Sequence, residues 1–215
     1  MTAGPEALAT RAASAPTGPA TPVAAIGRHG RLALGFERRG AATVLAACRW
    51  TLPLQVLAPL DLEPGTAVVS VLNPTGGLVG GDRLSIEARA AAGARACLTT
   101  PSATKVYRTA GAPAEQRVRL RVGPGAALEW VPDHTIPFAG ADFRQTIEAE
   151  VEEGGVLVLV DAFAAGRVAR GEAWAFARFD SALAVRDARG WLLHDRVALP
   201  AGLAAGGLGA CEGAA

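Results

Sequence analysis

The feature of this 215-residue sequence that most constrains its fold is a pattern that occurs three times. In each copy, polar and apolar residues alternate, a glycine turn follows, and a more continuously apolar run leaves the turn. Alternation with a period of two indicates strands that have one face in water and one face in a core. An isoleucine or valine lies seven residues before each turn glycine: Ile86 before Gly93, Val118 before Gly125, and Ile147 before Gly154.

The turn glycines are spaced 32 and 29 residues apart, which is a typical length for a stacked supersecondary unit. Units of this kind bury their apolar faces against their neighbours. Here the unit is two strands and a turn, and the apolar runs are 94–98, 126–131 and 156–160. We therefore predict an all-β fold of β-helix or solenoid type, a stack of strand pairs. An ordinary sandwich with evenly spaced hairpins is the alternative.

The rest of the chain belongs to the same fold class. Further strands are predicted at 32–37, 43–50, 68–72, 174–179, 182–186 and 192–199. Helical periodicity is weak, so at most a few short helices are expected, at 102–108 or 162–167. We predict a flexible N-terminal tail (1–27), a single all-β domain (28–200) and a loose Gly/Ala-rich tail (201–215).

Composition and targeting signals narrow the function classes. The formal net charge of +1 gives no electrostatic reason to expect nucleic acid or an anionic membrane as a partner. The most apolar stretch, 156–165, is interrupted by Asp161 and is too short to span a bilayer. No signal peptide is recognisable. We therefore expect a cytoplasmic protein.

The cysteine pattern agrees with this location. Cys48, Cys97 and Cys211 are odd in number and widely spaced, with no C-x-x-C pair. Disulfide scaffolds of secreted proteins are not built in this way, whereas a reducing cytosol fits. Because Cys97 lies within an apolar run, we expect it to be a small core residue.

The densest motif runs from Asn73 to Asp82 and contains four glycines. A phosphate-binding P-loop requires Lys and Ser or Thr after its last glycine, and a helix after them. Here Asp82 and Arg83 follow the last glycine, and a strand comes next. We therefore interpret these glycines as positions that need a positive φ or close packing of one chain segment on another.

Catalytic patterns are weak. Ser102 and Lys105 match the S-x-x-K of serine acyl enzymes, but the accompanying S-D-N and K-T-G are absent. The acids at 148, 150, 152 and 153 are best explained as a solvated strand face and turn. The residue patterns alone favour binding or assembly over catalysis.

No zinc-type spacing links the three histidines, which lie far apart in the chain at His29, His134 and His194. Asp133 and His134 together supply a carboxylate and an imidazole, ligands that suit a borderline metal such as nickel. A surface or structural histidine is the alternative at each position.

Four segments, in order, carry a family resemblance. The run from Asn73 to Asp82 is close to N-P-P-G-G-x-x-G-G-D, and 98–108 is similar to L-T-T-P-x-A-T-K-x-Y-R. The run 128–138 resembles L-E-W-x-P-x-x-x-I-x-F, and Gly166-Arg167 followed by Gly171-Glu172 resembles a later G-R…G-E element. These are motifs of the UreD/UreH family of urease accessory proteins, and the resemblance covers about residues 30–199.

The resemblance implies a non-enzymatic, cytoplasmic, β-helical protein that acts as a scaffold or chaperone in urease maturation. Its implied partners are apo-urease, a UreF-type helical accessory protein and, through UreF, a UreG-type GTPase. Nickel(II) would pass transiently, and no cofactor would be bound tightly. Two alternatives stay open: an all-β module that binds another protein or a carbohydrate, and a hydrolase that uses Ser102 and Lys105.

The resemblance, together with the ligand chemistry of Asp133 and His134, gives two sets of candidate site residues. The candidate passage residues, with no fixed metal site, are Asp82, Glu129, Asp133, His134 and Glu172. Residues expected to hold the fold or contact a partner are Asn73, Gly76, Gly77, Gly80, Gly81, Lys105, Tyr107, Arg108 and Trp130. Asp133-His134 stands where the family usually has Gln-Glu. The family continues with strands beyond the point matching Leu199, so we expect a C-terminally shortened member.

Overall fold

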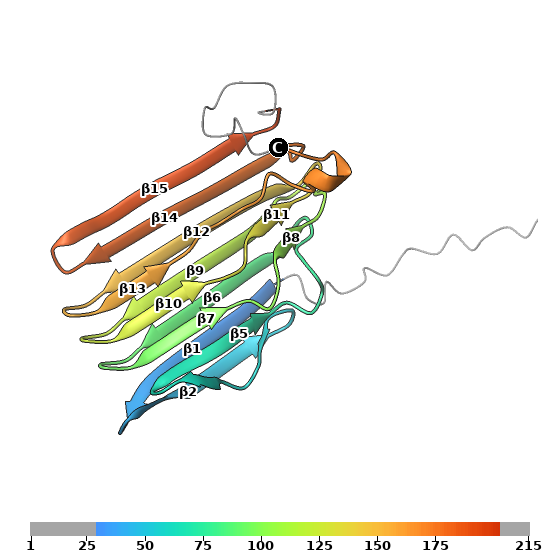
Figure 1. The fold of residues 1–215 in the computed structure, drawn as a ribbon. Helices are drawn as coiled ribbons and strands as arrows, with labels where there is room; N and C mark the ends of the chain where they lie inside the picture. The colour runs from blue at the N-terminus through green and yellow to red at the C-terminus, as the bar shows by residue number, and fades with distance from the viewer. Residues whose placement is uncertain (1–28, 203–215) are drawn as a thin grey trace, which may run out of the picture.

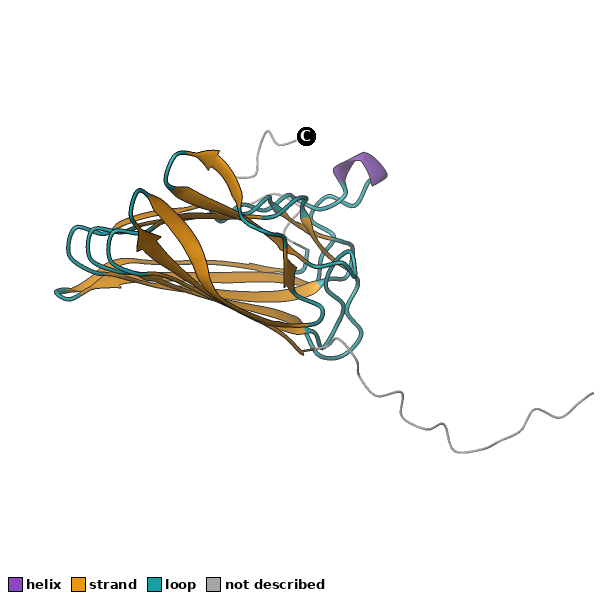
Figure 2. Ribbon diagram, turned by 90° about the horizontal axis from the view of Figure 1, so that it is seen from below, coloured by secondary structure: helices purple, strands orange, loops and turns teal. Residues whose placement is uncertain are grey.

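A computed structural model describes residues 29–202, and these form fifteen β-strands and one turn of 3-10 helix, η1 (Val168–Arg170). The expected tails lie outside the described residues except for Ala201 and Gly202. Two large sheets form two layers, which Figure 2 shows edge-on (Figures 1 and 2). No helix within 29–202 is long and apolar enough to cross a membrane.

The seven-stranded sheet has the order β15 (Gly190–Pro200), β14 (Arg178–Asp187), β12 (Asp142–Val151), β9 (Ala114–Val122), β6 (Arg83–Ala90), β1 (His29–Arg39), β2 (Ala42–Thr51). The six-stranded sheet has the order β13 (Val156–Leu159), β10 (Ala127–Val131), β7 (Arg95–Thr99), β5 (Thr66–Leu72), β3 (Gln55–Val56), with β4 (Leu60–Glu63) also paired to β5. A two-stranded sheet joins β11 (Thr135–Pro137) to β8 (Thr104–Val106).

The predicted solenoid is confirmed by how the strands pair. Each coil enters through the seven-stranded sheet, turns, crosses the six-stranded sheet and returns past the two-stranded one: β6-β7-β8, then β9-β10-β11. Successive coils pair in parallel. An ordinary sandwich of hairpins would pair them antiparallel, so that alternative is wrong. The tight turns lie together at one end of the strands (left in Figure 1).

The interior is built from the predicted repeat positions. Ile86, Val118 and Ile147 are direct cross-strand neighbours, and Leu32 of β1 extends the row. These four side chains are at most 3% exposed. Because alternate residues of a strand point to opposite faces, the apolar members face the other sheet. Burial of each such side chain contributes about 1.5–3 kcal/mol.

The opposite face of the seven-stranded sheet is charged. Arg119 of β9 lies between Glu87 of β6 and Glu148 of β12, at 3.6 and 3.1 Å. Arg186 of β14 pairs with Glu150 of β12. The predicted solvated face for the acids at 148 and 150 is therefore confirmed.

Both predicted helices are wrong. Within 102–108 the chain forms strand β8, because the parallel partner β11 satisfies its backbone groups. The segment 162–167 is irregular, and the helical turn comes after it, at Val168–Arg170. Helix propensity is weak in so short a segment, so the hydrogen bonds of the neighbouring coil decide the structure.

Two further predictions need correction. The strand predicted at 174–179 begins only at Arg178, because Trp174 and Phe176 pack edge-on against each other in the preceding loop. Cys97 is half-buried and faces outward rather than into the core. Its neighbours Ala96 and Leu98 take the inward positions of β7, at 1% and 0% exposure.

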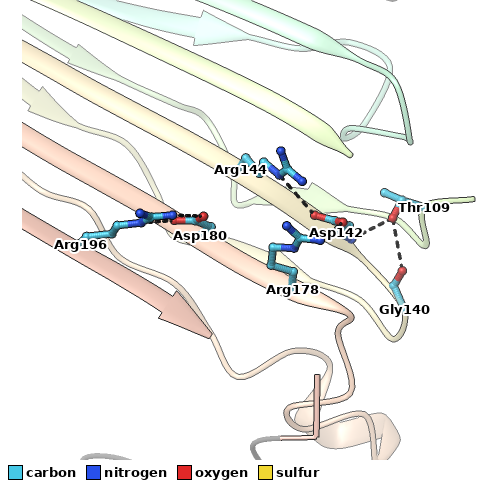
Figure 3. Close-up of polar contacts among 7 residues, drawn as sticks. All are labelled: Thr109, Gly140, Asp142, Arg144, Arg178, Asp180 and Arg196. Carbon is cyan, nitrogen blue, oxygen red and sulfur yellow. Dashed lines mark hydrogen bonds and ion pairs between the residues drawn. The ribbon is translucent and has the colours of Figure 1, made fainter. Parts of the chain in front are cut away.

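A row of ion pairs fastens the last strands to the sheet (Figure 3). Asp142 of β12 pairs with Arg178 of β14 at 3.2 Å. Arg196 of β15 donates two hydrogen bonds to the Asp180 carboxylate, from Nε at 2.9 Å and Nη2 at 2.7 Å. The hydrogen bonds from Arg196 lower the pKa of Asp180 below its ordinary value.

Asp180→Asn is expected to destabilise the protein by about 1 kcal/mol at neutral pH, as for a well-formed surface pair. Since the pKa is lowered in the folded state, this stabilisation is complete above the unfolded value of about 4 and is lost as the pH falls through the folded one. Melting temperatures of the two proteins, measured from pH 7 to about pH 2, should therefore converge as the pH falls below about 4. A difference that stays constant with pH would contradict the role of this carboxylate.

Candidate functional site

A cavity of about 150 Å³ lies between the two large sheets, beside β8. Its apolar lining comes from facing strands and includes Ile86 of β6 and Trp130 of β10, which is buried. Its polar lining consists of Asn73, Thr100, Ser102, Thr104, Lys105, Gln116, Asp133, Thr135, Gln145 and Asp161. The interior of the solenoid is thus polar at this end and apolar elsewhere.

A chain of hydrogen bonds crosses this polar part of the interior. Gln116 Nε2 donates to Gln145 Oε1 at 2.8 Å, and Gln145 Nε2 donates to Asp161 Oδ1 at 2.8 Å and Ser181 Oγ at 3.1 Å. Ser181 Oγ donates in turn to Asp161 Oδ2 at 2.6 Å. Gln145 and Ser181 are 6% and 4% exposed, whereas Asp161 is exposed. This series of hydrogen bonds therefore connects the buried interior with the solvent.

The sequence analysis did not identify this polar chain. Gln116, Gln145 and Ser181 are cross-strand neighbours on β9, β12 and β14. Gln116 and Gln145 lie two residues before the repeat positions Val118 and Ile147, on the face that points inward. Aligning the copies and noting polar residues at an inward position would have found them.

Asp133 lines the cavity, and His134 follows it in the chain and contacts its carboxylate. Asp133 Oδ1 accepts a hydrogen bond from the His134 backbone N–H at 2.8 Å and lies 2.7 Å from His134 Nδ1. The hydrogen bonds from His134 lower the pKa of Asp133. Asp133 N–H donates to Thr100 Oγ1 at 3.0 Å. Within residues 29–202, no group of three His, Cys, Asp or Glu side chains is placed to hold a metal ion.

Asp82, another of the passage candidates, lies in a turn and not on this cavity. Its Oδ2 accepts a hydrogen bond from the Val79 backbone N–H at 2.9 Å, and its own N–H donates to the Val79 carbonyl at 3.1 Å. The side chain is 6% exposed. Its local contacts thus close the glycine-rich turn onto the start of β6.

Glu172 also lies away from the cavity. Arg167 binds both of its carboxylate oxygens, with Nε at 2.8 Å from Oε2, and the Ala139 N–H donates to Oε2 at 3.2 Å. The hydrogen bond from Arg167 lowers the pKa of Glu172. A Cβ at Gly166 would lie 2.5 Å from the Glu172 carbonyl oxygen. The G-R…G-E element is therefore a tightly packed loop closure.

Glu129 faces the outside of the six-stranded sheet. Its β10 neighbours Leu128 and Trp130 point inward and are 0% and 2% exposed. Cys97 and Val158 are its cross-strand neighbours. Of the five passage candidates, the structure thus brings Asp133 and His134 together, with Asp133 on the cavity wall, and places Asp82, Glu129 and Glu172 apart.

The predicted close packing in the glycine-rich motif is confirmed at Gly77. A Cβ at this position would lie 2.5 Å from the Lys105 carbonyl oxygen and 2.7 Å from Tyr107 Cε2. The next residue, Leu78, pairs with Val106 of β8 in parallel. Further along, a Cβ at Gly80 would meet the Ala112 carbonyl oxygen at 3.0 Å, and Gly81 has a φ of 84°.

The other motif residues anchor neighbouring segments. The Asn73 side chain accepts one hydrogen bond from the backbone of its own loop and donates another, from Nδ2 to the Gly77 carbonyl oxygen at 3.3 Å. Tyr107 OH donates to the Gly76 carbonyl oxygen at 3.3 Å, and its ring meets Phe138 edge-on at 5.2 Å. Arg108 packs over Gly140, where a Cβ would lie 3.3 Å from its Cγ.

Gly77→Ala is expected to destabilise the protein by about 3 kcal/mol, the upper range for overpacking, because a backbone carbonyl cannot move aside. The matched control is Gly76→Ala, since a Cβ there meets only Tyr107 OH at 3.7 Å. Its cost is about 1–2 kcal/mol, from its positive φ. Denaturant unfolding of both variants checks the difference, and equal losses would contradict the close approach.

The chain is similar to known proteins over most of its length. A family model described as UreD urease accessory protein matches residues 28–215. A protein named urease accessory protein UreD from Delftia acidovorans is 43% identical over 157 residues, which are 72% of this chain and 52% of that relative. The proteins of the same name from Deinococcus radiodurans and Dechloromonas aromatica are 41% and 45% identical.

These matches also show how much of each relative's length this chain covers. The aligned regions cover 79% and 75% of this chain for the Deinococcus and Dechloromonas relatives, but only 61% and 57% of those relatives themselves. The chain therefore spans between about half and three fifths of the length of the curated relatives it matches.

Proposed function

Since the chain belongs to the UreD family of urease accessory proteins, we propose that it serves urease maturation as a non-enzymatic scaffold in the cytoplasm. The observation that carries this proposal is the family match over residues 28–215, with identities of 41–45% to relatives named as urease accessory proteins. The solenoid supports it, because stacked coils offer long, regular surfaces on which other proteins can assemble.

The partners in this proposal are apo-urease, a UreF-type helical accessory protein and, through UreF, a UreG-type GTPase. The glycine-rich motif supports the assignment of GTP hydrolysis to a partner. In this chain its glycines pack against Lys105 and Tyr107 and close a turn through Asp82. They are thus explained by chain packing and not by a nucleotide.

Nickel(II) is the cargo in this proposal, and the polar part of the interior is its route. Imidazole, carboxylate and amide oxygens suit nickel, and a conduit needs successive weak contacts because a tight site would retain the ion. Asp133 offers a carboxylate on the cavity wall, and the His134 imidazole lies next to that carboxylate. The hydrogen-bonded side chains of Gln116, Gln145 and Asp161 offer further oxygen ligands.

Complementation tests the proposal. The chain is expressed in cells that carry urease and every accessory protein except this one, and urease activity, urease-bound nickel and the soluble amount of the chain are measured. Restored nickel and activity are the expected result. A soluble chain that fails to rescue both alone and with the unmatched part of a relative grafted onto it would contradict the maturation role and favour a binding module without a urease role. Grafting the unmatched part of a relative would then test whether that part carries partner binding.

Asp133→Asn combined with His134→Gln is expected to lower the nickel content of matured urease several-fold at an unchanged melting temperature. Asp187→Asn is the matched control, since this aspartate caps a hairpin at the other end of the strands through Arg189 and Gly190. Metal analysis of purified urease measures the outcome. Equal nickel content in both variants would remove Asp133 and His134 from the route.

A further inference from the structure

The outer face of the seven-stranded sheet changes its charge pattern along the strands. Arg119 of β9 lies between Glu87 of β6 and Glu148 of β12 and pairs with both. Two residues earlier in each of these strands, the corresponding row consists of Ser85, Arg117 and Thr146. Two hydroxyl groups therefore flank Arg117 at the positions where two carboxylates flank Arg119.

A second arginine belongs to the same row. Arg31 of β1 is the cross-strand neighbour of Ser85 on the side opposite to Arg117. Neighbouring strands are about 4.8 Å apart, so the backbones of the two arginines are roughly 10 Å apart. Ser85 lies between them and is half-buried, whereas both arginines are exposed. Two side chains as long as arginine can therefore reach one small anion above Ser85.

A hollow of about 530 Å³ lies over this row. Four arginines and one carboxylate are among the residues that line it: Arg31, Arg83, Arg117, Arg144 and Glu115. The formal net charge of the whole chain is only +1, so positive charge is concentrated in this hollow. A concave surface lined mainly by one sign of charge attracts ions of the opposite sign.

The acids around the hollow already have arginine partners. The pairs are Glu115 with Arg83, Asp142 with Arg178 and at 4.0 Å with Arg144, Asp180 with Arg196, and Glu87 and Glu148 with Arg119 (Figure 3 shows those of Asp142 and Asp180). Among residues 29–202, neither Arg31 nor Arg117 has a carboxylate at ion-pair distance. These two guanidinium groups are therefore available to an anion from solution.

The donors of this row fit a phosphate group better than a carboxylate. Four strands, β1, β6, β9 and β12, supply two guanidinium and two hydroxyl groups. Arginine binds either anion through paired hydrogen bonds, but a carboxylate has two oxygens, and a tetrahedral phosphate has further oxygens for the hydroxyls. None of the described residues that line the hollow is Phe, Tyr or Trp, so a nucleobase would have no ring to stack on.

We propose that this hollow binds a phosphate group, with Arg31 and Arg117 on its two sides and the Ser85 hydroxyl beneath it. Thr146 adds a second hydroxyl beyond Arg117. Inorganic phosphate and phosphate monoesters share this chemistry, and separate probes distinguish them. The site is independent of the proposed nickel route, because the hollow is on the outer face of the sheet and neither Asp133 nor Gln145 lines it.

Binding is tested by ³¹P NMR titration of inorganic phosphate and of O-phosphoserine with the purified full chain. Low ionic strength is used because salt screens exposed charges. Line broadening that saturates is the expected result, and an equal concentration of acetate should displace little phosphate. Tighter binding of phosphoserine would assign the site to a phosphate ester, and tighter binding of inorganic phosphate to the free anion. If neither probe binds, or if acetate competes equally, the inference is overturned.

Arg117→Gln is expected to weaken phosphate binding about tenfold, because hydrogen bonds from a charged donor are lost. Arg119→Gln is the matched control, since Arg119 lies on the same strand and face but already pairs with Glu87 and Glu148. It should bind phosphate like the wild type. Equal weakening by the two changes would mean general attraction to a positive surface and would overturn the site.

Ser85→Glu copies the neighbouring row, because it places a carboxylate beside Arg117 as Glu87 stands beside Arg119. This variant should lose phosphate binding, whereas Ser85→Ala removes only the hydroxyl and should weaken binding several-fold. Both changes lie on the water-facing side of β6, and melting temperatures show that the variants are folded. A folded Ser85→Glu variant that binds phosphate like the wild type would contradict the assignment.

Discussion

Phe179→Ala is expected to lose about 3–5 kcal/mol of the free energy of unfolding, the range for removing a fully buried phenylalanine. Phe179 is 1% exposed and stacks on Phe163 with ring centroids 4.3 Å apart. Its ring also lies 5.8 Å from Phe143 and 6.4 Å from Phe176. Truncation would leave a cavity where the loop after β13 meets β14. The melting temperature should fall by roughly 6–20 °C for a chain of this size.

Denaturant unfolding measures this loss, and two further variants control it. Phe179→Leu keeps most of the volume and should lose clearly less. Val168→Ala removes an exposed apolar side chain and should change stability by no more than about 0.5 kcal/mol. If Phe179→Ala is as stable as Val168→Ala, the aromatic cluster does not hold this end of the solenoid.

Gln145→Leu is expected to destabilise the protein by about 1–3 kcal/mol, because the half-buried Gln116 amide loses its hydrogen-bond acceptor in the interior. Gln145 is the centre of the interior chain, accepting from Gln116 and donating to Asp161 and Ser181. Ser181 and Asp161 keep their mutual hydrogen bond, which limits the loss. If nickel follows this route, the nickel content of urease should also fall.

A double-mutant cycle separates the hydrogen-bonded chain from simple packing. Removing both amides, with Gln116→Leu and Gln145→Leu together, should cost less than the sum of the single changes, with a coupling of about 0.5–3 kcal/mol. Additive losses would mean that the two side chains do not act as a pair. Gln145→Glu keeps the shape of the side chain and adds a negative charge. The nickel content of urease, compared at equal amounts of variant and wild-type protein, therefore tests the route separately from stability.

The repeat was predictable from the sequence because it depends on local alternation. Ile86, Val118 and Ile147 could be aligned by their distance to a turn glycine, and the structure makes them direct neighbours. Short elements without a repeat were not predictable. Strand β8 has three residues, and its conformation depends on β11, which lies about thirty residues further along the chain.

The candidate site was only partly predictable for the same reason. The glycines of the 73–82 motif indicated close packing, and Gly77 confirms it through its approach to Lys105. Asp82, Glu129 and Glu172 carry charge in recognisable motifs, but the sequence does not specify the side of the sheet on which each lies. The interior chain of Gln116 and Gln145 joins residues 29 positions apart that carry no motif.

The sequence by itself determined the class of fold, the coil length and the family, because period-two alternation, turn glycines and motif residues are local properties of the chain. Only the tertiary structure decided that polar side chains line one end of the interior, that Asp82 and Glu172 close turns, and that Glu129 lies on the outer face of the six-stranded sheet. The reason is physical. Which groups meet across a solenoid depends on the register between coils, and register is set when the whole stack buries its apolar face.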